Sequence, residues 1–73
     1  MVVNLAALER NFDAGATVNT EGLLGAGLVK GRFDGVKILG NGELTKSLTV
    51  ESNRFSKTAQ EKIEKSGGTV VIV

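Results

Sequence analysis

The 73-residue chain contains no cysteine and no histidine. Without cysteine it can form neither disulfides nor thiolate metal sites. Without histidine it lacks the commonest general base and the commonest metal ligand, and nothing is present to activate a serine nucleophile. Glu61 and Glu64 fall on the polar face of a predicted helix, where carboxylates are hydrated rather than tuned for proton transfer. The sequence therefore predicts no enzyme activity, no metal site and no cofactor.

Aromatic residues and long apolar runs are also scarce. The only aromatic residues are Phe12, Phe33 and Phe55, which disfavours a single-strand binder that stacks bases on aromatic rings. Apolar runs such as Val70–Val73 are far too short to span a bilayer. Residues 1–7 lack the basic start and long apolar core of a signal peptide. We expect a soluble protein of the cytoplasm.

The length indicates a single globular domain over residues 1–73. A chain this short buries only about 60% of the surface that its unfolded form exposes, so its core is thin. Because disulfides and metals are excluded, extra support has to come from close packing or from a partner. We expect the isolated domain to be monomeric.

Charge is distributed unevenly along the chain, although the net charge is only +1. Residues 1–29 carry one basic and three acidic side chains, a net −2. Residues 30–57 carry three acidic side chains against six basic ones, a net +3; the basic ones are Lys30, Arg32, Lys37, Lys46, Arg54 and Lys57. This basic middle third indicates an anionic partner, although an ordinary solvated surface would show much the same pattern.

Three helices are predicted from apolar spacing and capping residues. Asn4 is placed to cap a helix over residues 5–12, and Asn19 a shorter helix that ends at Gly27. Ser56 is placed to cap a third helix, in which Phe55, Ala59 and Ile63 share one face and which ends at Gly67-Gly68.

Short strands alternate with these helices. Residues 2–3, 36–39 and 48–51 have strand patterns, and residues 69–73 have the composition of a fully buried strand. The resulting fold class is α+β, a compact alternation of short strands and three helices.

Two glycine clusters invite comparison with phosphate-binding loops. Gly40-Asn41-Gly42 follows a predicted strand, but the third glycine of a dinucleotide fingerprint is Thr45 here, and Glu43 occupies the place of the P-loop lysine. Asn-Gly is a common turn signal, so this segment is interpreted as a turn. The cluster in residues 22–31 follows no strand and is interpreted as a frayed helix with its stop.

The sequence resembles a known family along essentially its whole length. It is similar to the C-terminal half of bacterial large ribosomal subunit protein fifteen, the uL-fifteen family. The residues that carry the resemblance are Lys37-Ile38-Leu39-Gly40-Asn41-Gly42-Glu43-Leu44-Thr45-Lys46, Leu48-Thr49-Val50, Phe55-Ser56, Ala59, Ile63 and Gly67-Gly68, with Val3-Asn4-Leu5, Leu8, Val18 to Leu23 and Gly27-Leu28-Val29 upstream.

The resemblance implies a structural protein of the large ribosomal subunit that binds ribosomal RNA, has neighbouring ribosomal proteins as partners and lacks catalytic activity. It also implies a small irregular superhelical fold of strand–strand–helix turns, related to the eighteen-e proteins. The family's long basic glycine-rich N-terminal half is absent from these 73 residues, and residues 22–35 and 51–53 hold fewer lysines and histidines than the family usually shows. We therefore expect weak RNA affinity for the domain alone.

Two main hypotheses follow, with a ligand binder that uses the glycine loops as a third. The first is a ribosomal RNA-binding structural domain in which Lys30, Arg32, Lys37, Lys46, Arg54 and Lys57 contact phosphates. The alternative is a free-standing protein–protein adaptor without RNA contact. Clustering of these basic residues on one exposed face favours RNA, and dispersal favours the adaptor.

Overall fold

The computed structural model describes residues 1–30 and 35–73. Its elements in chain order are β1 (Val2–Asn4), α1 (Leu5–Asn11), β2 (Thr17–Val18), α2 (Thr20–Gly25), β3 (Lys37–Leu39), β4 (Thr49–Ser52), β5 (Arg54–Phe55), α3 (Lys57–Lys65) and β6 (Thr69–Ile72). Helices and short strands alternate, so the predicted α+β class is confirmed.

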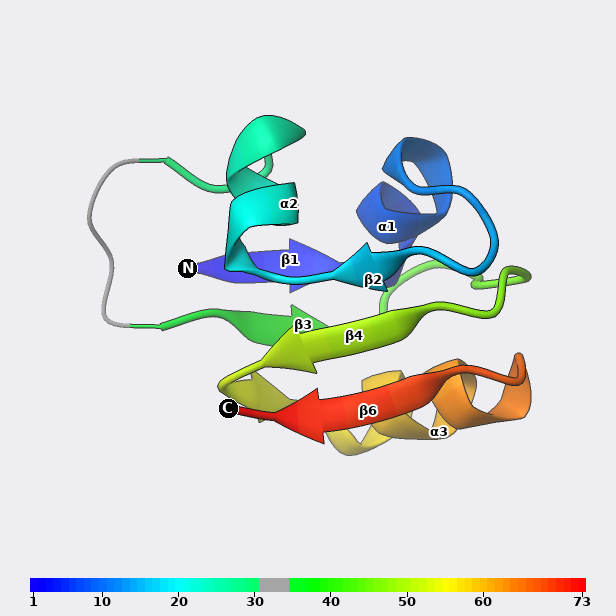
Figure 1. Cartoon of the computed structure of the whole chain (residues 1–73). Coiled ribbons are helices and arrows are strands. Elements are labelled where there is room, and N and C mark those ends of the chain that lie inside the picture. Colours follow the sequence, from blue (N-terminus) through cyan, green and yellow to red (C-terminus); the bar gives the residue numbers. More distant parts are fainter. Residues whose placement is uncertain (31–34) are drawn as a thin grey trace.

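The strands form two three-stranded sheets, ordered β1-β3-β5 and β2-β4-β6, in which every pairing is parallel. The chain passes from one sheet to the other with each successive strand, and so winds through three turns of a coil. Figure 1 shows β1 and β3 running in one direction and β4 and β6 in the other. Helices α1 and α3 join the sheets in the first and third turns, whereas in the second turn residues 40–48 cross without a helix.

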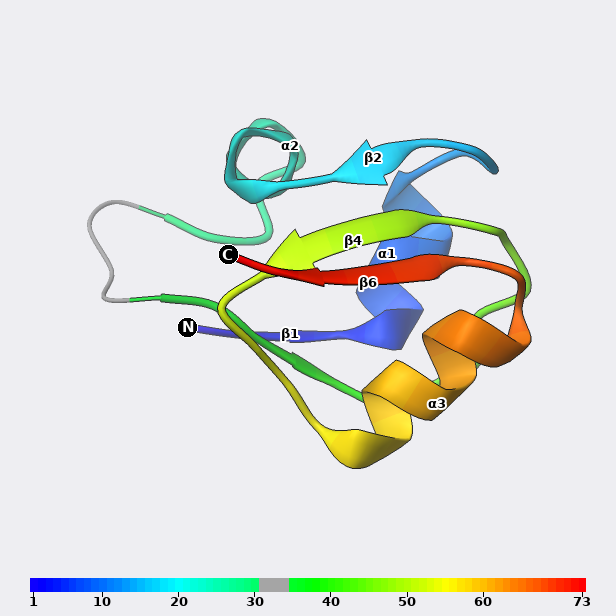
Figure 2. The same cartoon turned by 60° about the horizontal axis from the view of Figure 1, so that its bottom comes forward.

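The core lies between the two sheets and under the helices. Residues 3, 38 and 55 form the inward row of the first sheet, and residues 18, 50 and 70 that of the second. This follows from the strand geometry, since successive side chains point to opposite faces. In the described ranges the buried apolar residues are Val3, Leu5, Leu8, Val18, Leu23, Val29, Val36, Ile38, Leu44, Leu48, Val50, Ala59 and Ile63. Figure 2 shows the opening between the sheets edge-on, with α3 along one side.

The caps of α2 and α3 confirm the sequence prediction. The Asn19 side chain accepts a hydrogen bond from the Gly22 N–H (2.8 Å), and Ser56 Oγ accepts one from the Ala59 N–H (3.1 Å). Helix α3 ends with Gly67 at φ +88° and with the Gly68 N–H bonded to the Ile63 carbonyl. These are the bonds of a Schellman motif, and α2 ends in the same way at Gly27.

Helix α1 departs from the prediction at both ends. It stops at Asn11 rather than Phe12, and Asn4 occupies the N-cap position without making a side-chain capping bond. Instead, Asn4 Oδ1 accepts a hydrogen bond from Asn41 Nδ2 (3.2 Å). Asn4 thus joins the start of α1 to the second turn of the coil.

Three strand predictions need correction. Strand β2 was missed, because two residues are too few to show an alternating pattern. Phe55 belongs to β5 and precedes α3, so it lies outside the helical face of Ala59 and Ile63. The prediction of a fully buried strand at residues 69–73 is wrong, since Ile72 is 70% and Val73 66% exposed. Strand β6 stands at the edge of its sheet and pairs with β4 alone.

Candidate nucleic-acid interface

Two of the predicted RNA-contacting residues lie side by side on the outer face of the first sheet. Lys37 in β3 pairs in register with Val2 of β1 on one side and with Arg54 of β5 on the other. All three are exposed, and paired residues of parallel strands point to the same face. We call Val2, Lys37 and Arg54 the basic row. Its two cations stand on neighbouring strands, about 4.8 Å apart at the backbone.

The electrostatics of the basic row are unusual for a sheet. Like charges on neighbouring strands destabilise the pairing, and carboxylates normally offset them. In residues 1–30 and 35–73, the only ion pair joins Lys62 and Glu43 (3.8 Å), so no described carboxylate pairs with Lys37 or Arg54. An anion placed over both cations would relieve this repulsion.

A groove of about 390 Å³ adjoins the basic row at the chain termini. Its lining consists of Met1, Val2, Gly35, Val36, Lys37, Asn53 and Arg54, and we call it the terminal groove. The Asn53 side chain fixes one wall, because its Oδ1 accepts from the Val36 N–H (2.9 Å) and its Nδ2 donates to the Val73 carbonyl (3.2 Å). The strand backbone is fixed as well, by bonds from the Lys37 N–H to the Met1 carbonyl and from the Arg54 N–H to the Val36 carbonyl.

Lys46 is engaged within the protein. Its Nζ donates to the carbonyls of Glu9 (2.7 Å) and Phe12 (2.8 Å), at the C-terminal end of α1. A cation favours this end of a helix because the last carbonyls are unpaired and carry partial negative charge. The second-turn crossing lies at the end of the molecule opposite the termini (Figure 1). Lys46 is therefore not part of the basic row.

The remaining predicted contacts are spread over the surface. Lys57 is the first residue of α3 and is exposed, and Lys30 is exposed directly after the buried Val29. Arg32 lies outside the described residues. The structure thus brings two of the six predicted residues together, Lys37 and Arg54.

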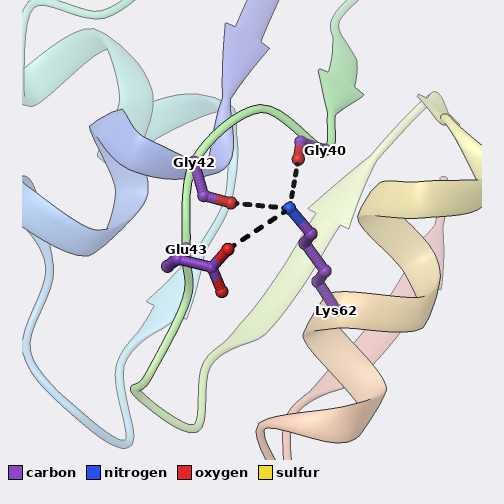
Figure 3. Close-up of polar contacts among 4 residues, drawn as sticks. All are labelled: Gly40, Gly42, Glu43 and Lys62. Atoms are coloured by element: carbon purple, nitrogen blue, oxygen red, sulfur yellow. Dashed lines mark hydrogen bonds and ion pairs between the residues drawn. The ribbon is translucent and has the colours of Figure 1, made fainter.

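Sequence reasoning missed the part played by Lys62 of α3. Its Nζ donates to the carbonyls of Gly40 and Gly42, both at 2.9 Å, and pairs with the Glu43 carboxylate (Figure 3). The sequence placed Lys62 only in the last turn of its helix, where the dipole favours any cation. Nothing in the local pattern indicates a partner 20 residues upstream.

The glycines of this crossing serve close packing. A Cβ at Gly40 would stand 2.7 Å from the Thr58 Cβ, and Gly42 has φ +92° and lies against Ala6 of α1. The segment bends at Gly42 alone, since Asn41 keeps a negative φ. Its carbonyls converge on an ammonium group (Figure 3), whereas a phosphate loop directs N–H groups at an anion.

A second set of bonds attaches the crossing to α1. The Glu9 carboxylate accepts from the Thr45 N–H (3.1 Å) and from the Thr45 hydroxyl (2.6 Å). These bonds hold the pKa of the Glu9 carboxyl below its ordinary value, with the hydroxyl as the largest cause and Lys46 adding to the effect. Thr45 and Lys46 together fix this end of the crossing to the first helix.

Comparison with known proteins places these features in a family. Residues 2–71 match the profile of the family described as ribosomal proteins 50S-L15 and 50S-L18e with their 60S counterpart. The chain is 59% identical over 71 residues to large ribosomal subunit protein uL15 of Agathobacter rectalis, a match that covers 97% of this chain and 48% of that protein. The uL15 protein of Myxococcus xanthus is 55% identical over 69 residues, covering 94% and 39%. For Fervidobacterium nodosum uL15 the values are 50% over 72 residues, 99% and 49%.

The chain spans about half the length of these relatives, and the match falls on their C-terminal part. Within the described ranges, no helix is long and apolar enough to cross a membrane.

Proposed function

The chain belongs to the family of ribosomal proteins 50S-L15 and 50S-L18e and their 60S counterpart, and from this membership we propose that it is a structural constituent of the large ribosomal subunit that binds ribosomal RNA through phosphate contacts. The observation that carries the proposal is the basic row, where Lys37 and Arg54 stand in register on an exposed face without a described carboxylate partner. Arginine and lysine bind phosphate without base-specific chemistry, as contacts to structured RNA require.

The proposed contacts number two or three rather than six. Lys37 and Arg54 supply two, and the exposed Lys30 and Lys57, with Arg32, stand in the same basic segment of the sequence. Lys46 has two of its three N–H donors committed to carbonyls, so only one is left for a phosphate. We expect weak affinity for the 73-residue domain alone.

The remaining parts of the proposal follow from the family. Residues 1–73 form one globular domain that is monomeric when isolated, acts in the ribosome of the cytoplasm and has neighbouring ribosomal proteins and ribosomal RNA as its partners. The proposed role is structural and not enzymatic, and it requires no cofactor. A sequence with neither histidine nor cysteine supports the absence of catalysis.

The test is the salt dependence of binding to fragments of large-subunit ribosomal RNA. Removal of one phosphate contact reduces the slope of log affinity against log salt by about 1. We expect that reduction for Lys37→Ala and for Arg54→Ala. The matched control is Lys65→Ala, which removes an exposed lysine of α3 from outside the basic row. Binding that ignores salt would rule out phosphate contacts.

The adaptor hypothesis draws on a different observation. Lys46 faces inward, and the exposed residues Ile72 and Val73 at the edge of the second sheet could pair with another protein. Failure to bind any ribosomal RNA fragment at low salt, while the domain remains folded by circular dichroism, would favour the adaptor over the RNA-binding role.

A further inference from the structure

The terminal groove combines two kinds of surface that fit different parts of one ligand. One side carries the cations of Lys37 and Arg54. The other side carries Met1 and Val2, apolar residues that remain 49% and 56% exposed. Sites for small ligands have volumes of about 300–1,000 Å³ and combine apolar walls with a few polar groups, and the groove is of this size at about 390 Å³.

The spacing of the two cations suits a single phosphate. Side chains in register on neighbouring strands start about 4.8 Å apart, so both can reach the same phosphodiester group. The guanidinium of Arg54 also has a flat face on which a base can stack. Phe12 and Phe55 are partly buried against the core, so stacking at the groove would use Arg54 rather than a ring of either.

We propose that the terminal groove accepts one unpaired nucleotide of the bound RNA, with its phosphate between Lys37 and Arg54 and its base or ribose against Met1 and Val2. The inference rests on the proposed function and deepens it. A base that is held in a paired helix cannot enter the groove, whereas a bulged or looped base can. The domain therefore distinguishes RNA with an unpaired nucleotide from a regular duplex, although its charge contacts treat the two alike.

The experiment compares a hairpin RNA with the same hairpin carrying one bulged nucleotide. We expect the 73-residue protein to bind the bulged RNA about fivefold more tightly, the low end of the range for stacking one base. Val2→Ser removes the apolar wall without changing charge and should abolish the preference. Leu24→Ser is the matched control, because Leu24 is a 44% exposed apolar residue of α2 that does not line the groove. It should keep the preference.

The outcomes separate the two proposals. Salt-dependent binding that weakens in Lys37→Ala and Arg54→Ala, but is equal for the two RNAs, would overturn the nucleotide site and leave the phosphate contacts standing. A preference that survives in Val2→Ser would overturn the groove as its source. Absence of binding to either RNA at low salt would remove the proposed function, and the nucleotide site with it. Circular dichroism of each variant confirms that the fold is retained.

Discussion

At the scale of single residues, the lysines of this domain divide into two groups with different roles. Lys37 has no described hydrogen-bond or carboxylate partner for its side chain and stands on an open face, where a ligand can reach it. Lys46 and Lys62 instead donate to backbone carbonyls of the first helix and of the second-turn crossing. A basic residue in this sequence is therefore as able to hold the chain together as to hold RNA.

Replacement of Lys46 tests this division. Lys46→Met keeps the aliphatic stem but leaves the carbonyls of Glu9 and Phe12 without their donor. Because hydrogen bonds from charged groups are stronger than neutral ones, we expect a loss of about 1–3 kcal/mol in the free energy of unfolding, measured by urea denaturation. Lys65→Met, an exposed lysine of α3, is the control and should change stability by less than about 0.5 kcal/mol. Equal stabilities for the two variants would contradict the bracing role of Lys46.

Glu9 predicts a dependence of stability on pH. Its folded-state pKa is lowered, chiefly by the Thr45 hydroxyl, so its bonds stabilise the fold above the unfolded-state pKa of about 4.3. This contribution is lost as the pH falls below that value toward the folded-state pKa. Between about pH 6 and pH 3, the free energy of unfolding of the parent should fall more steeply than that of Glu9→Gln. Thr45→Val should be intermediate, because the Thr45 N–H still donates. Parallel curves for all three proteins would exclude this linkage.

At the scale of secondary-structure elements, features set by neighbouring residues were predictable and features set by distant ones were not. The caps at Asn19 and Ser56 were found because each cap and its partner lie three residues apart. Strand β2 was missed because its two residues take their strand conformation from pairing with β4. The exposure of β6 was missed because the pattern of an apolar run does not reveal whether a strand stands at the centre or the edge of a sheet.

The same limit applies to the candidate site. Charge along the sequence singled out six basic residues, but it could not show that Lys37 and Arg54 become neighbours through β3 and β5. Nor could it show that Lys46 turns toward carbonyls more than 30 residues upstream. Local patterns do not encode such contacts, which arise only when the coil closes.

Helix α3 carries the clearest prediction at this scale. Ile63 is fully buried in the core, and the helix packs against β6 and β3. Ile63→Ala should lower the free energy of unfolding by about 2–5 kcal/mol, through reduced burial and the cavity left behind. Gln60→Ala, at an exposed position of the same helix, should have little effect and controls for helix propensity. A urea midpoint for Ile63→Ala that matches the parent would show that this face contributes little to the core.

At the scale of the whole molecule, the coil assembles the candidate site from all three of its turns. Val2, Lys37 and Arg54 come from the first, second and third turns and meet only because β1, β3 and β5 pair in register. The second turn lacks a helix, and its crossing is held by Lys62 on one side and by Glu9 and Lys46 on the other. The brace of the crossing thus supports the turn that places Lys37, although the two lie in different parts of the turn.

The same architecture predicts a domain of low stability. The described buried apolar set contains no aromatic residue, and the sheets are built from strands of two to four residues. A small core without disulfides or metals supplies rarely more than about 3–5 kcal/mol. We therefore expect a free energy of unfolding at or below about 5 kcal/mol in a two-state urea melt of the isolated 73 residues. Repeating the melt with saturating ribosomal RNA should raise the midpoint, because a ligand that binds only the folded state stabilises it. An extrapolated value well above about 5 kcal/mol without RNA would mean that packing between the two sheets contributes more than their short strands indicate.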